Sequence, residues 1–382
     1  MIEGPLTEQK LQHKVWPLFS RVRTEHAGIY LANHSLGRPP DRVAADVSRA
    51  LDAWYRDMGG AWTEWLAARE KFRALIAQLV GAKRADCIVP KTSAGQGLRA
   101  VLNALDRNPR GKPQVVTTDG EFDSLDFILR VYREQGRIDL RIMPWRELQL
   151  GNATLVVLSS VMFRSGERVE NLGKLMRAAR AAGALVLLDV YHHAGALPLD
   201  LAALEVDFAV GGCYKYLRGG PGACWLYVRP GLVETMRTPD TGWFAKHDVF
   251  SYERPDPPQF GAGGDAWLES TPPVLAPVQA LAGLELTLEL GVDRLRAYSL
   301  EQKQLLAELL ATQRVQAEGA GEDHGAFLTV THPQAVRLAE ELERRGIRTD
   351  ARGDRLRLCP DILNSKAELA QAAGELGALL SS

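Results

Sequence analysis

The stretch CYKYLRGGPG, residues 213–222, follows an apolar run, 206–210, that predicts a buried strand. Lys215 therefore stands at the end of that strand, between two tyrosines and just before Gly-Gly-Pro-Gly. A lysine in this position must either reach water or take part in chemistry, because burying an unpaired ammonium group is costly. The groups that the rest of the chain supplies decide between these two interpretations.

The composition describes a globular protein with no strong overall charge. Of 382 residues, 46% are hydrophobic and 24% are charged, and 46 basic residues against 47 acidic ones give a formal net charge of −1. This balance offers no attraction for nucleic acid or an anionic membrane. The N-terminus lacks the pattern of a secretory signal and no apolar run has membrane-spanning length, so we expect a cytoplasmic protein.

Short β-branched runs alternate with helical patterns through the middle of the chain, after two helices within 41–82 that are interrupted near Gly59. This alternation predicts an α/β fold, with a mainly parallel sheet covered by helices on both faces. The expected strands are 114–117, 154–160, 184–190, 207–212 and 223–228.

A segment rich in proline and glycine, 250–273, marks the predicted end of this large domain. Beyond it the pattern indicates a long helix from 274 past Asp293, strands at 326–330 and 355–358, and helices at 333–345 and 366–380. We therefore expect three parts: an N-terminal segment (1–40), a large domain (41–273) and a small C-terminal α+β domain (274–382).

Residues that follow the predicted strands are the candidates for chemistry, because ligands of open parallel sheets bind beyond the carboxyl ends of the strands. Pyridoxal phosphate requires a lysine for a Schiff base, an acid for its ring nitrogen, an anion site for its phosphate and an aromatic face for its ring. The chain offers these as Lys215, Asp189, the small-residue loop with Ser93 and Ala94, and Phe122. Such a loop before a helix presents free N–H groups to a phosphate.

Several motifs resemble those of kynureninases, within the class V aminotransferase group of fold type I pyridoxal-phosphate enzymes. They are YLANHSLGRPP (30–40), DVYHH (189–193), VDFAVGGCYKYLRGGPG (206–222), GWF (242–244), ESTPP (269–273) and LRLCP (356–360). The resemblance implies that Asp189 and His192 hold the pyridine end of the cofactor, and that Tyr214, Trp243 and Ser270 contact its phosphate. It also implies a homodimer with shared active sites.

On the substrate side, the resemblance assigns Arg357 to the α-carboxylate, which a guanidinium can hold through two parallel hydrogen bonds. Arg355 lies on the same face of the predicted strand and is the competing candidate. The other substrate-binding candidates are Thr271, His34 and Ser35. Thr271 stands where kynureninases typically have asparagine, and VMFRSGE (161–167) and EFDSLDF (121–127) also depart from the family pattern.

The resemblance implies a hydrolase that cleaves the Cβ–Cγ bond of kynurenine, or of a related γ-keto amino acid, to alanine and an acid. The alternatives are a class V aminotransferase, desulfurase or epimerase, and a noncatalytic protein that binds pyridoxal phosphate for regulation. A metal site is not expected, because the adjacent His192 and His193 would point to opposite faces of a strand and the four cysteines have no CxxC spacing.

Overall fold

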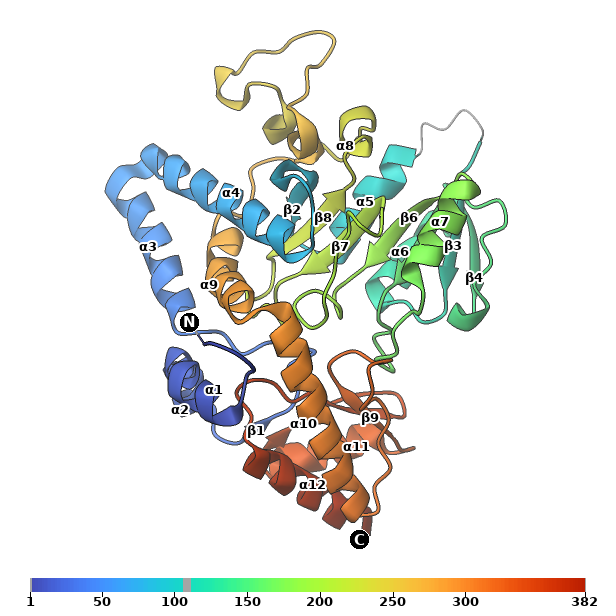
Figure 1. Cartoon of the computed structure of the whole chain (residues 1–382). Coiled ribbons are helices and arrows are strands. Elements are labelled where there is room, and N and C mark those ends of the chain that lie inside the picture. The colour runs from blue at the N-terminus through green and yellow to red at the C-terminus, as the bar shows by residue number, and fades with distance from the viewer. Residues whose placement is uncertain (1, 106–110, 382) are drawn as a thin grey trace.

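The computed structural model describes residues 2–105 and 111–381, and its centre is a seven-stranded sheet (Figure 1). The strands run in the order β2 (Ile88–Lys91), β8 (Cys224–Val228), β7 (Phe208–Gly212), β6 (Leu185–Asp189), β5 (Leu155–Ser159), β3 (Gln114–Thr118) and β4 (Asp139–Met143). The pairs from β7 through β4 are parallel, and only β8 pairs antiparallel, with β7 and with β2. The prediction of a mainly parallel sheet is confirmed.

The central strands are buried along their whole length, as their continuous apolar sequences require. The helices α5 (Ala94–Leu105), α6 (Asp123–Glu134) and α7 (Leu172–Ala181) connect and cover them, and α5 packs on β7 and β8. Two long helices, α3 (Arg42–Asp57) and α4 (Ala61–Leu79), precede the sheet, with the expected interruption at 58–60. A short helix, α8 (Leu232–Thr235), follows β8.

The structure contains a strand, β4, that the sequence analysis did not predict, so the list of expected strands is corrected. Its residues, DLRIM, are exposed or half-buried, because β4 pairs with β3 alone at the edge of the sheet. An edge strand needs no continuous apolar run, so the pattern that identified the central strands does not apply to it.

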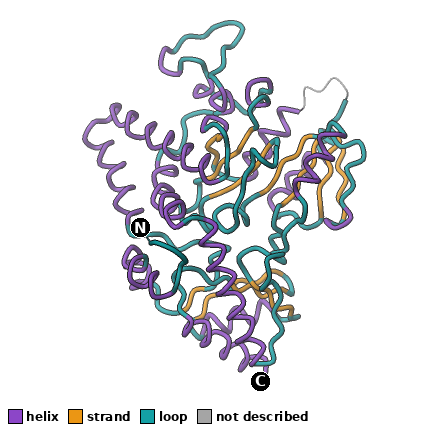
Figure 2. The backbone as a smooth tube through the Cα atoms, viewed as in Figure 1, coloured by secondary structure: helices purple, strands orange, loops and turns teal. Residues whose placement is uncertain are grey.

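The C-terminal part of the chain forms a second group of strands and helices, which Figure 2 shows below the large sheet. Its three-stranded antiparallel sheet has the order β11 (Asp350–Arg352), β12 (Arg355–Leu358) and β9 (Leu328–Thr331). The helices α10 (Val292–Thr312), α11 (Ala335–Arg344) and α12 (Lys366–Ser381) complete it, with a core that includes Leu306, Leu356 and Leu369.

The long helix expected from 274 past Asp293 is in fact two helices, α9 (Leu275–Leu290) and α10, which meet at an angle of 82°. Gly291 lies between them with φ 79°, a conformation that glycine adopts without strain. Among the described residues, no single helix is long and apolar enough to cross a membrane. Only α9 and α10 taken together pass that test of length and composition.

The N-terminal segment lies against the C-terminal part. Its helices are α1 (Glu8–Lys14) and α2 (Ser20–Glu25), and strand β1 (Ile29–Tyr30) pairs in parallel with β10 (Ile347–Arg348). Leu11 and Phe19 share a core with Leu290, at the end of α9, and with Leu363. Earlier in α9, Leu284 belongs to the core of the large sheet. The division of the chain at residues 40 and 273 stays a prediction.

Candidate active site

A cavity of about 460 Å³ lies beyond the carboxyl ends of β5, β6 and β7, where the sequence predicted the site. Its lining includes seven of the predicted residues: Ser93, Ala94, Phe122, Asp189, His192, Tyr214 and Lys215. They come from four segments of the chain that follow different strands, so the order of strands in the sheet brings them together.

Lys215 is 6% exposed, and its Nζ lies 2.8 Å from His192 Nε2. Burial lowers the pKa of this amine, and the Asp189 carboxylate opposes that shift. The other ring nitrogen of His192, Nδ1, lies 3.2 Å from Tyr216 Oη, so both ring nitrogens have a partner. Burial also lowers the pKa of His192, which keeps the imidazole neutral.

The glycines around Lys215 allow its loop to pack tightly. A Cβ on Gly37 would lie 1.9 Å from Lys215 O, and one on Gly283 would lie 2.0 Å from Leu217 O. Gly220 and Gly222 have φ of 70° and 86°, where other residues would be strained. The N-terminal segment and α9 thus enclose the loop on two sides, and Gly-Gly-Pro-Gly lets it turn between them.

Two buried carboxyl groups are associated with the cavity: Asp189 lines it, and Glu121 contacts the lining residue Ser159. Asp189 Oδ1 accepts a hydrogen bond of 2.8 Å from Tyr191 N, and burial raises the pKa of Asp189. Glu121, which the sequence analysis did not select, accepts hydrogen bonds from Ser159 Oγ (2.6 Å) and Thr118 Oγ1 (2.7 Å). Burial raises the pKa of Glu121 to about 7, and the nearby Asp189 adds to that shift.

The predicted phosphate loop enters α5 at Ala94. Gln96 N donates to Ser93 Oγ (3.2 Å), and the N–H groups of the first turn of a helix have no partners inside the helix. A Cβ on Gly97 would lie 2.6 Å from Val210 Cγ1, so glycine lets α5 approach β7 closely. Arg99, a residue that the sequence analysis did not select, also lines this end of the cavity.

These groups fit pyridoxal phosphate. The cavity offers an amine at Lys215, a buried carboxyl at Asp189, a helix N-terminus for an anion and the ring of Phe122, whose centroid lies 5.8 Å from Lys215 Nζ. The donor set therefore matches the amine, acid, anion site and aromatic face that this cofactor needs.

Arg357 is 2% exposed on β12, and its Nη2 donates to Asp350 Oδ2 at 2.5 Å. Arg355 instead pairs with the exposed Glu318, so of the two candidates Arg357 is the buried one. Asp350 also accepts a hydrogen bond from Ser35 Oγ, and its Oδ2 lies 3.4 Å from His34 Nε2. Three predicted substrate residues, His34, Ser35 and Arg357, thus meet at a carboxylate that the sequence analysis missed.

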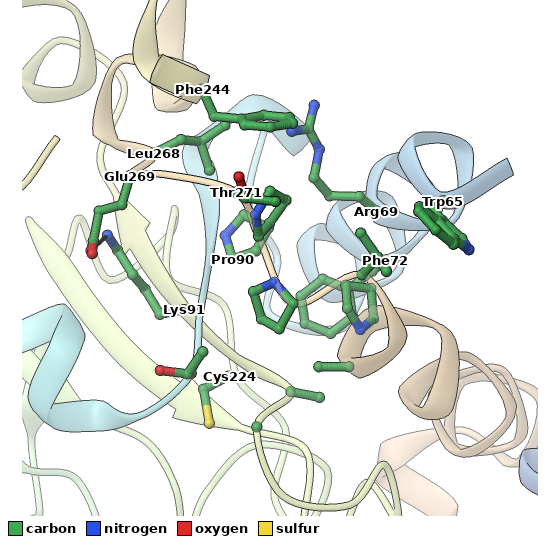
Figure 3. A pocket seen from close by; sticks show the side chains of 18 of the residues that line it. Trp65, Arg69, Phe72, Pro90, Lys91, Cys224, Phe244, Leu268, Glu269 and Thr271 are labelled. Atoms are coloured by element: carbon green, nitrogen blue, oxygen red, sulfur yellow. Dashed lines mark hydrogen bonds and ion pairs between the residues drawn. The ribbon is translucent and has the colours of Figure 1, made fainter. Parts of the chain in front are cut away.

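His34, Ser35 and Arg357 do not themselves line the Lys215 cavity. The last three predicted residues, Trp243, Ser270 and Thr271, lie elsewhere in the single chain. Ser270 and Thr271 line a neighbouring cavity of about 250 Å³ (Figure 3), and Trp243 Nε1 donates to Thr271 Oγ1 at 3.1 Å. Figure 3 shows the ion pair between Lys91 and Glu269 (2.9 Å) at one side of this cavity. None of the three predicted residues lines the Lys215 cavity of its own chain.

His193 is held by hydrogen-bond contacts and does not line the Lys215 cavity. Its Nδ1 lies 3.2 Å from Ser160 Oγ and its Nε2 lies 3.0 Å from Pro198 O, so both ring nitrogens have partners. Within residues 2–105 and 111–381, no group of three or more His, Cys, Asp or Glu side chains is arranged to hold a metal ion.

Comparison with known proteins gives the family. Residues 29–361 match the model of the family described as Aminotransferase class-V. The chain belongs to the class V aminotransferase family. It is 30% identical to a kynureninase from Deinococcus radiodurans over 355 residues, which cover 88% of this chain and 84% of the relative.

Solved structures show the same fold at lower identity. A variant of C-DES, with glycine covalently linked to its PLP cofactor, superposes with a TM-score of 0.83 at 19% identity, covering 94% of this chain and 98% of that one. A cysteine desulfurase from Escherichia coli superposes with a TM-score of 0.80 at 18% identity, covering 99% of each chain. The predictions of the class V family, fold type I and pyridoxal phosphate as cofactor are confirmed. The roles assigned to individual residues of this class V chain stay predictions.

Proposed function

We propose that the protein is a kynureninase-like hydrolase that cleaves the Cβ–Cγ bond of kynurenine, or of a related γ-keto amino acid, to alanine and an acid. The observation that carries the proposal is the buried Lys215 amine, in one cavity with Asp189 and the phosphate loop, in a chain 30% identical to a kynureninase. The reaction consumes one water: its hydroxyl group joins the γ-carbonyl carbon and its hydrogen ends on Cβ.

When bound, pyridoxal phosphate supplies an electron sink for bond changes at the substrate Cα. Lys215 holds the cofactor and then moves the Cα proton, a role for which its lowered pKa favours the neutral amine. His192 orients Lys215 through their 2.8 Å contact. Asp189 would pair with the ring nitrogen of the bound cofactor and favour its protonated form, while Arg357 would hold the substrate α-carboxylate.

Desulfurase activity is the rival that the solved structures raise, and the cysteines of this chain argue against it. A desulfurase nucleophile must be mobile and reach the substrate as a thiolate. All four cysteines here are buried. Cys224 lines the Lys215 cavity, but burial raises its pKa to about 11, which disfavours the thiolate.

Product analysis tests the proposal. Purified holoenzyme incubated with kynurenine should release alanine and anthranilate in equal amounts, and Lys215→Ala should release neither. Incubation of other amino acids with keto-acid acceptors tests transamination in the same preparation. Borohydride reduction should fix the cofactor on the peptide that contains Lys215. Label on another lysine, or turnover by transamination alone, would contradict the proposal. Bound cofactor without any turnover would favour the regulatory alternative.

We further propose a homodimer in which Ser270 and Thr271 reach the cofactor of the partner subunit. Both residues are exposed in the single chain and lie outside the Lys215 cavity. The irregular segment around residues 250–273 gives them the reach for a neighbouring subunit, and symmetric dimers are the commonest assembly.

A further inference from the structure

Asp350 is the point at which the N-terminal segment and the C-terminal sheet meet beside the Lys215 cavity. Its Oδ2 accepts from Arg357 Nη2 and from Ser35 Oγ, and its Oδ1 accepts from Arg352 Nη1 at 2.7 Å. Its side chain is 9% exposed. Burial alone would raise the pKa of Asp350, but His34 and Arg357 lower that pKa by a larger amount. The net shift is downward, so Asp350 is a carboxylate at any ordinary pH.

Arg357 is held at both ends of its guanidinium and still has an unused donor. Nη2 donates to Asp350, and Nη1 donates to the backbone oxygen of Phe163. Phe163 is one of the residues that line the Lys215 cavity. Among the residues that the structure describes, Arg357 Nε is buried and has no hydrogen-bond partner. A buried donor without a partner costs about 1–3 kcal/mol, so a ligand that supplies an acceptor to this Nε would be stabilised there.

Two arginines surround Asp350, one buried and one half exposed. Arg352 and Arg357 are both ion-paired to the single Asp350 carboxylate. Burial lowers the pKa of His34 to about 3, so this imidazole is neutral and adds no charge. Solvent screens the half-exposed Arg352, so Arg357 is the buried cation of this cluster and the group that a substrate α-carboxylate would meet.

We propose that Asp350 is a positioning residue: it fixes the Arg357 guanidinium so that its free Nε edge receives the substrate α-carboxylate. The inference rests on the carboxylate-binding role proposed for Arg357. It makes carboxylate recognition depend on a residue that does not touch the substrate. The opposite role is a competitor that occupies Arg357 and weakens substrate binding, and the two roles predict changes of opposite sign.

The test measures ligand binding to the holoenzyme and needs no turnover. L-alanine and L-alaninamide are titrated separately, and the visible absorption of the bound cofactor reports occupancy. The two ligands share an amine and differ in the carboxylate. Wild-type protein should bind alanine more tightly than alaninamide. Asp350→Ala should weaken alanine binding about 10- to 100-fold, the loss expected for a charged hydrogen bond, and leave alaninamide binding nearly unchanged.

Asp350→Asn is the conservative variant. Asparagine has one side-chain oxygen, whereas Asp350 accepts hydrogen bonds on two, so Asp350→Asn should hold Arg357 less firmly than the wild type does. Alanine binding should therefore weaken, but by less than in Asp350→Ala. Asp354→Ala is the matched control, because Asp354 is in the same hairpin and pairs with Arg164 at the surface. This control should bind alanine as the wild type does.

The outcomes separate this inference from the role of Arg357. If Arg357→Ala keeps the preference for alanine over alaninamide, the carboxylate role of Arg357 is wrong and the inference fails with it. If Arg357→Ala loses the preference but both Asp350 variants keep it, only the positioning role is wrong. Tighter alanine binding in either Asp350 variant would make Asp350 a competitor and overturn the inference. Asp350→Asn gives this answer even if Asp350→Ala does not fold.

Discussion

Lys215 is a buried amine whose environment favours loss of its proton. The neutral amine is the form that attacks the cofactor aldehyde, and burial lowers the pKa of Lys215 below that of an ordinary lysine. We predict that the rate at which apoprotein takes up pyridoxal phosphate rises with pH and levels off well below pH 10. Stopped-flow absorbance at a series of pH values measures this, and a rate that still rises at pH 10 would contradict it.

Glu121 should make stability depend on pH. An unfolded glutamate loses its proton near pH 4.5, whereas burial raises the pKa of Glu121 to about 7 in the folded protein. The stability that comes from the protonated form is complete below pH 4.5 and is lost as the pH rises toward 7. Relative to wild type, Glu121→Gln should therefore gain up to about 3 kcal/mol between pH 5 and pH 8.

Urea unfolding of apoprotein at the two pH values measures this difference. Asp119→Asn, which removes an exposed carboxyl two residues away, is the control. An equal difference between Glu121→Gln and wild type at both pH values would show that Glu121 has no raised pKa.

The sequence predicts the residues that follow strands better than it predicts their partners. Lys215, Asp189 and Phe122 come together because each follows an apolar run and parallel strands end at one edge. Asp350 was missed because in TDARGD it resembles surface charge among arginines. Its contacts with Ser35 and Arg357 depend on the small sheet meeting the N-terminal segment, which no local pattern encodes.

At the scale of elements, the loop 213–222 requires small residues on its neighbours. Gly283→Ala would place a Cβ 2.0 Å from Leu217 O, a backbone atom that cannot move without shifting the loop. We expect this variant to lose about 1–3 kcal/mol of stability, as overpacking does, and to bind less cofactor per chain. Gly374→Ala, in α12 with no atom near the added Cβ, should instead gain up to about 1 kcal/mol.

Thermal unfolding and cofactor absorbance per chain measure both glycine variants. Normal cofactor content in Gly283→Ala, together with an unchanged Tm, would show that the loop can yield to the extra methyl group.

The boundaries of an element were predictable where its sequence has a regular period. Strand β12 has the predicted bounds, because its alternation of arginine and leucine has the two-residue period of a strand; Arg357, on the face opposite the leucines, is nevertheless buried. The bend between α9 and α10 was not predicted, since one glycine inside an apolar helical pattern is compatible with a continuous helix. Contacts of Leu290 and Leu295 with the N-terminal segment lie on the two sides of the bend, and these are not local.

At the scale of the molecule, a dimer with shared sites predicts complementation. Lys215→Ala lacks the cofactor lysine, and a Ser270→Ala, Thr271→Ala double variant lacks the residues proposed to reach the partner. Each alone should have low activity. Co-expressed chains that pair at random should recover about a quarter of wild-type activity, because half of the dimers then have one intact site of two. No recovery in isolated heterodimers would place Ser270 at the site of its own chain.

The pairing of β1 with β10 means that residues translated early depend on residues translated much later. Leu11 and Phe19 pack with Leu363, and Ile29 pairs with Ile347. At roughly 5–20 residues per second, a ribosome needs on the order of 15–60 s to make the intervening chain. During that time the apolar side chains near the N-terminus of the nascent polypeptide have no native partner, so they are available to chaperones. A chain that stopped before residue 347 would leave these side chains without the partners that cover them in the folded protein.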